Sequence, residues 1–198
     1  MSAEPQHMRV VDDGLTVEAP RGRGVGGCFI ELLAMIFAAC VVALLLRAFV
    51  IESYEVPSGS MLDTIQIGNR LIGEKVSYRF REPAQGEIVT FWRDDDRGGR
   101  DILVKRVIAV GGQTVDLKDG TVYVDGVALD EPYTEGKPSL PLDDDYQFPY
   151  TVPAGHLWVM GDNRTNSSDS RAFGPVSVED VTSHIVIVFW PFSDFRTL

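Results

Sequence analysis

Three stretches of this 198-residue chain carry residues that could do chemistry. The first is Pro57-Ser58-Gly59-Ser60-Met61. Proline fixes one backbone angle and glycine permits conformations that other residues resist, so such a loop can expose a hydroxyl and direct backbone N–H groups toward one point. A serine nucleophile with an oxyanion site has these requirements. A plain Ser/Gly turn has the same composition, and the loop by itself does not separate the two interpretations.

The second stretch is Ile102–Val110, whose β-branched residues predict a strand. Because strand residues alternate between two faces, Lys105 lies opposite Arg106. It shares its face with the apolar residues Leu103, Val107 and Ala109. Burial among apolar side chains lowers the pKa of a lysine and leaves a neutral amine that can accept a proton near neutral pH. The alternative is a cation on an edge strand whose ammonium reaches water.

The third stretch, Gly161–Arg171, contains two Asp, two Asn, two Arg and three Ser in eleven residues. It directly follows an apolar segment that predicts a strand. Such a composition is typical of a solvated loop, and equally of a polar network that supports an active site through Asp–Arg pairs and side-chain hydrogen bonds.

These stretches follow one long apolar segment. Cys28–Leu46 is 19 residues long and contains a single charged residue, Glu31. About 20 apolar residues cross a membrane as a helix, so we expect a transmembrane anchor over 25–51. A buried helix of a soluble domain would have a polar stripe, and a cleavable signal peptide would have a shorter apolar core.

Charges around the apolar segment predict its orientation. Arg21 and Arg23 precede it, whereas Glu52 and Glu55 follow it. We expect residues 1–24, which are polar, to be a disordered tail. The positive-inside rule predicts that this tail lies in the cytoplasm and that the domain of residues 52–198 is exported. Arg47 is a signal in the opposite direction.

The exported part predicts mostly strands. The candidate strands are Leu71–Tyr78, Glu87–Arg93, Ile102–Val110, Thr114–Leu117, Thr121–Val124, His156–Met160 and His184–Trp190. Lys118-Asp119-Gly120 predicts a hairpin, Asp125-Gly126 a second tight turn, and Val178–Val181 after Ser177 one helical turn. The Pro- and Asp-rich segment Pro132–Tyr150 predicts a long surface excursion.

Composition excludes several functions. The formal net charge of −11 argues against a nucleic-acid partner. Both cysteines, Cys28 and Cys40, lie in or beside the apolar segment, so the exported part has no disulfide and no thiol nucleophile. The runs 94–96 and 143–145 of aspartate lack the spacing of a calcium loop, and the three histidines form no zinc motif or Ser-His-Asp arrangement. We therefore expect no metal and no cofactor.

Taken together, the blocks resemble bacterial type I signal peptidases, membrane-anchored serine/lysine proteases. The blocks occur in the family's order: PSGSM at 57–61, GEIVTF at 86–91, VKRVIAVGG at 104–112 and GDNRTNSSDSR at 161–171. The resemblance covers residues 32–198. It implies a mostly β fold, an antiparallel domain with a coiled, barrel-like core after one transmembrane helix, in the bacterial cell membrane.

The resemblance also implies roles for individual residues. Ser60 is the nucleophile and Lys105 its general base, while the Ser58 hydroxyl and the backbone N–H of Ser60 form the oxyanion site. Ser167 hydrogen-bonds and orients the Lys105 amine. The supporting residues are Asp169 and Arg171, which brace the loop, and Asp162 and Arg164, with a similar role.

The implied partners are the lipid bilayer and the signal peptides of exported precursors. The resemblance implies that a signal peptide binds in an extended conformation, with small residues at positions −1 and −3. It also implies an enzyme that acts as a monomer. The chain departs from the family pattern at Asp63, where proline is usual, and at Asn69 and Gln113, where aspartate is frequent. Two alternatives stay open. One is a self-cleaving Ser/Lys protein, against which the anchor argues. The other is a membrane-tethered β-domain that binds a partner without cleaving it.

Overall fold

The computed structural model describes residues 25–94, 98–142 and 145–198. The tail expected over 1–24 lies outside the described residues, as do residues 95–97 and 143–144 of the two aspartate-rich segments. The chain divides into two compact units, Met1–Val41 and Val42–Leu198. The boundary falls within the first helix.

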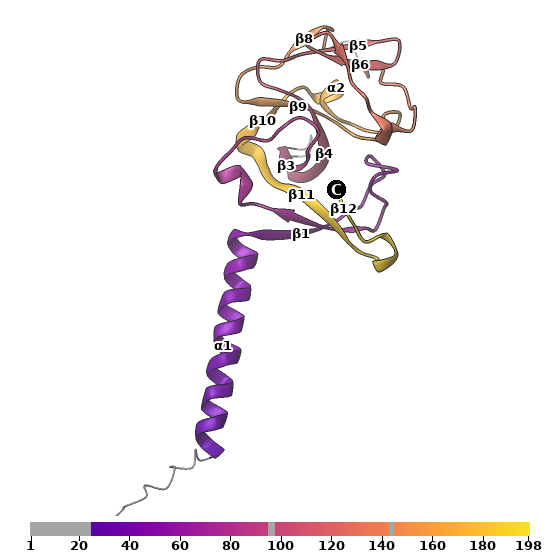
Figure 1. Ribbon diagram of the computed structural model, residues 1–198. Coiled ribbons are helices and arrows are strands. Elements are labelled where there is room, and N and C mark those ends of the chain that lie inside the picture. Colours follow the sequence, from indigo (N-terminus) through magenta and orange to yellow (C-terminus); the bar gives the residue numbers. More distant parts are fainter. Residues whose placement is uncertain (1–24, 95–97, 143–144) are drawn as a thin grey trace, which may run out of the picture. The chain divides into compact units, whose positions relative to one another are not determined.

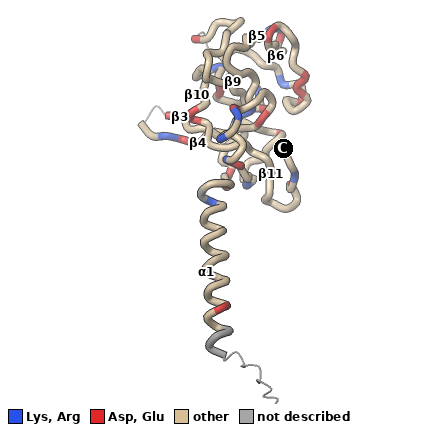
Figure 2. Tube along the Cα trace, turned by 60° about the vertical axis from the view of Figure 1, so that its left-hand side comes forward, with Lys and Arg blue, Asp and Glu red and all other residues tan. Residues whose placement is uncertain are grey.

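Helix α1 spans Val25–Phe49. Within it, Phe29–Arg47 is long and apolar enough to cross a membrane, and none of it is buried by protein; no other helix in the described residues meets that test. Figure 2 shows no acidic or basic position along the helix between Glu31 and Arg47. The helix ends two residues before the expected end of the anchor, because Ile51 already begins strand β1 (Ile51–Glu55) and pairs with the next strand.

Eight of the described strands form one antiparallel sheet in the order β1-β2-β11-β3-β4-β9-β10, with β12 beside β11 (Figure 1). Their bounds, besides β1, are β2 Arg70–Glu74, β3 Ile88–Asp94, β4 Arg100–Val110, β9 His156–Met160, β10 Val176–Ser177, β11 Val181–Trp190 and β12 Arg196–Thr197. The expected antiparallel fold is confirmed. The described strands do not close into a barrel, because β1 and β10 remain at opposite ends of the sheet.

Four described strands form a smaller antiparallel sheet in the order β7-β6-β5-β8. They are β5 Thr114–Lys118, β6 Thr121–Val124, β7 Val127–Ala128 and β8 Tyr150–Thr151. The expected hairpin between β5 and β6 is confirmed: Asp119 and Gly120 have φ values of 50° and 81°. Two consecutive left-handed residues match the twist of the flanking strands, and Asp125 and Gly126 repeat the arrangement at the next turn, with φ values of 52° and 80°.

Strand β2 ends at Glu74, whereas the sequence predicted a strand to Tyr78. The Glu74 carboxylate accepts hydrogen bonds from the backbone N–H groups of Val76 and Ser77, at 2.9 and 3.0 Å, and so starts the 3₁₀ turn Ser77–Arg79. The other 3₁₀ turns are Pro132–Thr134, Val178–Asp180 and Phe192–Asp194. The expected turn after Ser177 is confirmed, with the Ser177 hydroxyl accepting from the Glu179 N–H.

A β-bulge in β4 corrects the predicted alternation of its faces. Val107 pairs with Val159 and Ala109 with Trp158, so Ile108 is the extra residue. Leu103 and Val107 therefore pack in one cluster as expected, but Ala109 packs with Ile108 in another. An extra residue shifts the two-residue period by one, which no sequence pattern here revealed.

The segment Pro132–Tyr150 is less of a surface excursion than the sequence predicted. Thr134 and Ser139 are buried. The rings of Tyr146, Phe148 and Tyr150 pack around the Trp158 ring of β9, with centroids 5.9, 5.7 and 4.9 Å away. These aromatic contacts bury apolar area and hold the segment against the core cluster of the smaller sheet.

Candidate active site

Buried apolar side chains hold the loop that carries Ser60. Met61 and Ile65 are buried in the cluster between β1, β2 and β11. The Ile65 N–H donates to the Met61 carbonyl at 2.7 Å, which closes a helix-like turn directly after the serine. Burial of Met61 next to a half-buried serine fixes which way the loop faces. Ser60 is thereby presented on the side of β4.

Lys105 meets Ser60 from the middle of β4, and its Nζ lies 2.7 Å from Ser60 Oγ. Its residue is only 3% exposed. Burial lowers the pKa of Lys105 to about 8 from an ordinary 10.5. The charges of Asp169 and Asp162 oppose this shift, and that of Arg171 adds to it. The amine is therefore positioned and poised to accept the hydroxyl proton.

The loop 161–171 supports the Ser60 loop through hydrogen bonds to its backbone. The Asn163 backbone N–H donates to the Ser60 carbonyl at 3.0 Å, and Asn163 Nδ2 donates to the Gly59 carbonyl at 2.9 Å. A Cβ atom at Gly161 would collide with the Ser60 carbonyl and with Ser167 Oγ. Neither the hydrogen bonds of Asn163 nor the close packing at Gly161 was predicted from the sequence. The only available signal was the glycine that ends an apolar strand.

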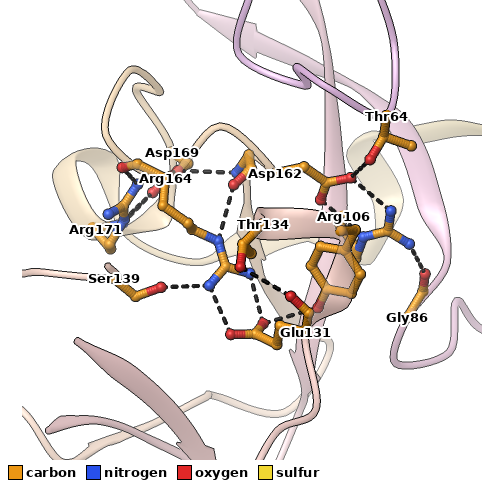
Figure 3. Close-up of polar contacts among 12 residues, drawn as sticks. Thr64, Gly86, Arg106, Glu131, Thr134, Ser139, Asp162, Arg164, Asp169 and Arg171 are labelled. Atoms are coloured by element: carbon orange, nitrogen blue, oxygen red, sulfur yellow. Dashed lines mark hydrogen bonds and ion pairs between the residues drawn. The ribbon is translucent and has the colours of Figure 1, made fainter. Parts of the chain in front are cut away.

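Asp162 connects this loop to β4 (Figure 3). Its fully buried carboxylate accepts two hydrogen bonds from Arg106, at 2.9 and 2.6 Å, and one from Thr64 Oγ1 at 2.5 Å. The Arg106 guanidinium also lies 3.9 Å above the ring of Tyr133. Because Arg106 and Lys105 are neighbours on opposite faces of β4, this ion pair fixes the strand that carries the lysine.

Arg164 connects the loop to the segment that precedes the 3₁₀ turn at Pro132. Its buried guanidinium donates to both oxygens of Glu131, at 2.8 and 2.6 Å, and to Ser139 Oγ at 2.5 Å (Figure 3). Asp162 and Arg164, expected in similar supporting roles, thus each have an ionic partner outside the loop. Those partners, Arg106 and Glu131, were not identified from the sequence.

Asp169 and Arg171 contact each other, with Arg171 Nε donating to Asp169 Oδ1 at 2.9 Å, and both are essentially fully buried. Asp169 also precedes the short helix α2 (Ser170–Phe173) as its N-cap and accepts from the Gly161 N–H at 3.0 Å. The carboxylate therefore ties the end of β9 to α2.

The expected hydrogen bond between Ser167 and Lys105 is not formed. Ser167 Oγ is buried and has no hydrogen-bond partner among the described residues. The Lys105 amine is directed at Ser60 Oγ instead. Ser58 lines the same two cavities as Ser60.

The two cavities meet at the Ser60–Lys105 pair. One, of about 370 Å³, lies between the segment from Glu52 to Met61 and the β4 residues Ile102–Lys105. The other, of about 380 Å³, is lined by Ser58, Gly59, Ser60, Arg93, Leu103, Lys105, Asn166 and Ser168. A substrate chain that crosses the serine can thus occupy both.

A serine hydroxyl 2.7 Å from a buried amine of lowered pKa is the arrangement that a serine hydrolase with a lysine base requires. Comparison with known proteins narrows the class. The family model "Signal peptidase, peptidase S26" matches residues 29–190, which include most of α1 and both Ser60 and Lys105. The chain belongs to this signal peptidase family, which confirms the resemblance seen in the sequence.

Two relatives agree with the family. A probable signal peptidase I-1 of Synechocystis sp. is 41% identical over 174 residues, covering 85% of this chain and 86% of the relative. The signal peptidase I of Leptolyngbya laminosa is 38% identical over 167 residues, covering 81% and 79%. A crystal structure of a signal peptidase I from Enterococcus faecalis is 33% identical, with a TM-score of 0.42 over 52% of this chain and 97% of that one.

Proposed function

We propose that this chain is a serine endopeptidase that removes signal peptides from exported precursors by a Ser/Lys dyad. The observation that carries the proposal is the 2.7 Å separation between Ser60 Oγ and the buried Lys105 Nζ, inside a chain of the signal peptidase family. The serine supplies a nucleophile, and desolvation of the lysine supplies its base without a histidine.

The chemistry follows from this pair. Neutral Lys105 accepts the proton of the Ser60 hydroxyl as Oγ attacks the scissile carbonyl carbon. The Ser58 hydroxyl and the Ser60 backbone N–H hold the resulting oxyanion. The protonated lysine then donates its proton to the leaving amine, and a water molecule, deprotonated by Lys105, hydrolyses the acyl-serine. Asp162, Arg164, Asp169 and Arg171 act from outside the reaction, by holding the two loops in register.

The sheet offers backbone edges to an extended substrate. Among the described strands, β1 pairs only with β2, and residues 100–105 of β4 pair only with β3. The 370 Å³ cavity is lined by β1 on one wall and by residues 102–105 of β4 on the other. Each of these segments has one edge whose backbone N–H and C=O groups are unpaired with another described strand. A peptide bound by strand addition places alternate side chains, those at −1 and −3, into the cavity, and Met61, Ile65 and Val104 limit these side chains to small ones.

The location of the reaction follows from the anchor. Four residues separate β1 from Ser60, so a domain that begins at residue 52 carries its nucleophile close to the membrane surface. The flanking charges place residues 1–24 in the cytoplasm and the catalytic domain outside the bacterial cell membrane. In this proposal the partners are the bilayer and a signal peptide, the enzyme acts as a monomer, and no nucleic acid takes part.

Cleavage of a defined precursor tests the proposal. The full-length chain in detergent micelles is incubated with a precursor that has alanine at −1 and −3, and with a matched precursor that has leucine at −1. Mass spectrometry is expected to show one new N-terminus, at the predicted bond, for the alanine precursor alone. Binding of the precursor without cleavage would support a binding domain instead, and cleavage of the enzyme's own chain alone would support a self-cleaving protein.

The pH dependence of cleavage reports the state of the lysine. Since only the neutral amine can accept the serine proton, a pKa of about 8 leaves about a tenth of the molecules active at pH 7. We expect kcat/KM to rise about tenfold per unit below pH 8, to be half-maximal near pH 8 and to level off above it. Initial rates between pH 6 and 10.5 check this. A midpoint near the ordinary lysine value would show that the amine is solvated.

A further inference from the structure

The cavity that lies on the Arg93 side of Ser60 has a charge of its own. Of its eight lining residues, Arg93 and Lys105 are basic and none is acidic. Lys105 must be neutral when it acts as the base, so Arg93 is the permanent cation of this cavity. The other cavity is lined by Glu52 and Glu55 and by no arginine. The two sides of the nucleophile therefore differ in sign.

Arg93 is held in place by its neighbours. It lies near the end of β3 on the face that also carries Phe91, which pairs across the strands with Leu103. Its guanidinium carbon lies 4.1 Å from the centre of the Phe173 ring, a cation–π contact that holds the group against the ring without neutralising its charge. Among the described residues no carboxylate forms an ion pair with it; the cross-strand neighbour Asp101 is exposed to water.

Strand alternation decides which substrate side chains meet this cation. If the side chains at −1 and −3 enter the cavity beside Val104, those at −2 and +1 project to the opposite face of the bound strand. On that face of β4, Leu103 and Lys105 line both cavities, whereas Val104 lines only the 370 Å³ cavity and Arg93 only the other. The substrate side chains at −2 and +1, on either side of −1, therefore lie in a positively charged cavity.

We propose that Arg93 is a specificity-determining residue that favours precursors with an acidic side chain at −2 or +1. The inference rests on the proposed function and extends it to a preference within the cleavage sequence. A guanidinium held against a ring presents a pair of donors to a carboxylate. Because the cavity is open to water and Asp101 is nearby, we expect a preference of about three- to fivefold, the size typical of a partly exposed ion pair.

Four peptides and the full-length enzyme in detergent test the preference. All peptides have alanine at −1 and −3, and they carry either glutamate or glutamine at −2 or at +1. The wild-type chain is expected to show a glutamate-to-glutamine ratio of kcat/KM of about three to five, at one position or both, that falls toward one in 1 M salt. Arg93→Gln is expected to bring the ratio to about one, and Arg93→Lys to an intermediate value, because lysine keeps the charge but not the planar pair of donors.

Arg100→Gln is the matched control. Arg100 lies at the start of the neighbouring strand and pairs with Asp94 and Asp180, at 3.0 and 2.9 Å, outside the cavity lining. The Arg100→Gln variant loses the same charge as Arg93→Gln and is expected to keep the wild-type glutamate-to-glutamine ratio of kcat/KM. Equal loss of preference in both variants would overturn the inference in favour of overall charge. Efficient cleavage of all four peptides with a wild-type ratio of one would overturn it while the proposed function stands, whereas no cleavage of any peptide would refute both.

Discussion

Replacement of Ser60 by alanine is expected to lower the rate of precursor cleavage by about 10⁴- to 10⁶-fold, and Lys105→Met by a similar factor. The alanine lacks the attacking oxygen. The methionine fills the buried position of the lysine but has no basic nitrogen to take the proton. Because the two groups act as one unit across 2.7 Å, the double variant is expected to be no slower than either single variant.

Initial rates measured by mass spectrometry, with the thermal unfolding midpoint of each variant, check this prediction. Matched controls come from exposed residues of the same types: Ser193→Ala, and Lys118→Met on the smaller sheet, whose lysine side chain is 62% exposed. Both controls are expected to cleave at the wild-type rate. Activity within tenfold of wild type in a folded Ser60→Ala or Lys105→Met variant would refute the dyad.

Asp169→Ala is expected to have the largest effect on stability. The carboxylate is fully buried, pairs with the equally buried Arg171 and accepts the Gly161 N–H. Its removal leaves a buried guanidinium without a counter-charge, which typically costs about 3–5 kcal/mol of unfolding free energy. For a domain of this size we expect the unfolding midpoint to fall by on the order of 10 °C. Thermal unfolding of the full-length chain in detergent, followed by circular dichroism, measures the shift.

Asp180→Ala is the control for that prediction. Asp180 pairs with Arg100 at 2.9 Å, but both side chains are substantially exposed, at 39% and 53%. An exposed ion pair contributes about 0–1 kcal/mol, so the midpoint is expected to move by no more than a few degrees. Equal shifts for the two variants would contradict the argument that burial makes the Asp169–Arg171 pair important.

The sequence predicted the elements whose information is local. The apolar run of α1, the alternation of β4 up to Val107 and the Asp-Gly hairpin turn each follow from short patterns, and the structure contains all three. Prediction failed where tertiary contacts override the pattern. Strand β2 ends at Glu74, whose carboxylate accepts the N–H groups of Val76 and Ser77 at the next turn, and the bulge at Ile108 reverses the faces that follow it.

The site divides in the same way. Residue types and their order, together with the family resemblance, were sufficient to propose Ser60 as nucleophile, Lys105 as base and the loop 161–171 as their support. Strand alternation predicted an apolar surrounding for the lysine, and it is buried. The ion pairs that hold the loop were not predictable, since Arg106 is 56 residues from Asp162 and Glu131 is 33 residues from Arg164. No local pattern pairs charges at such separations.

What the sequence determined by itself was therefore an apolar helix long enough to cross a membrane, a β-domain, a serine, a lysine and the chemistry available to them. Only the tertiary structure decided that the two groups meet, across 45 residues of chain, at 2.7 Å. It also decided that the Ser167 hydroxyl has no hydrogen-bond partner among the described residues, that Asn163 holds the serine loop, and that Arg93 lines a cavity beside the nucleophile. The physical reason is that hydrogen bonds and ion pairs act over a few ångströms, and only packing of the whole sheet brings distant residues within that range.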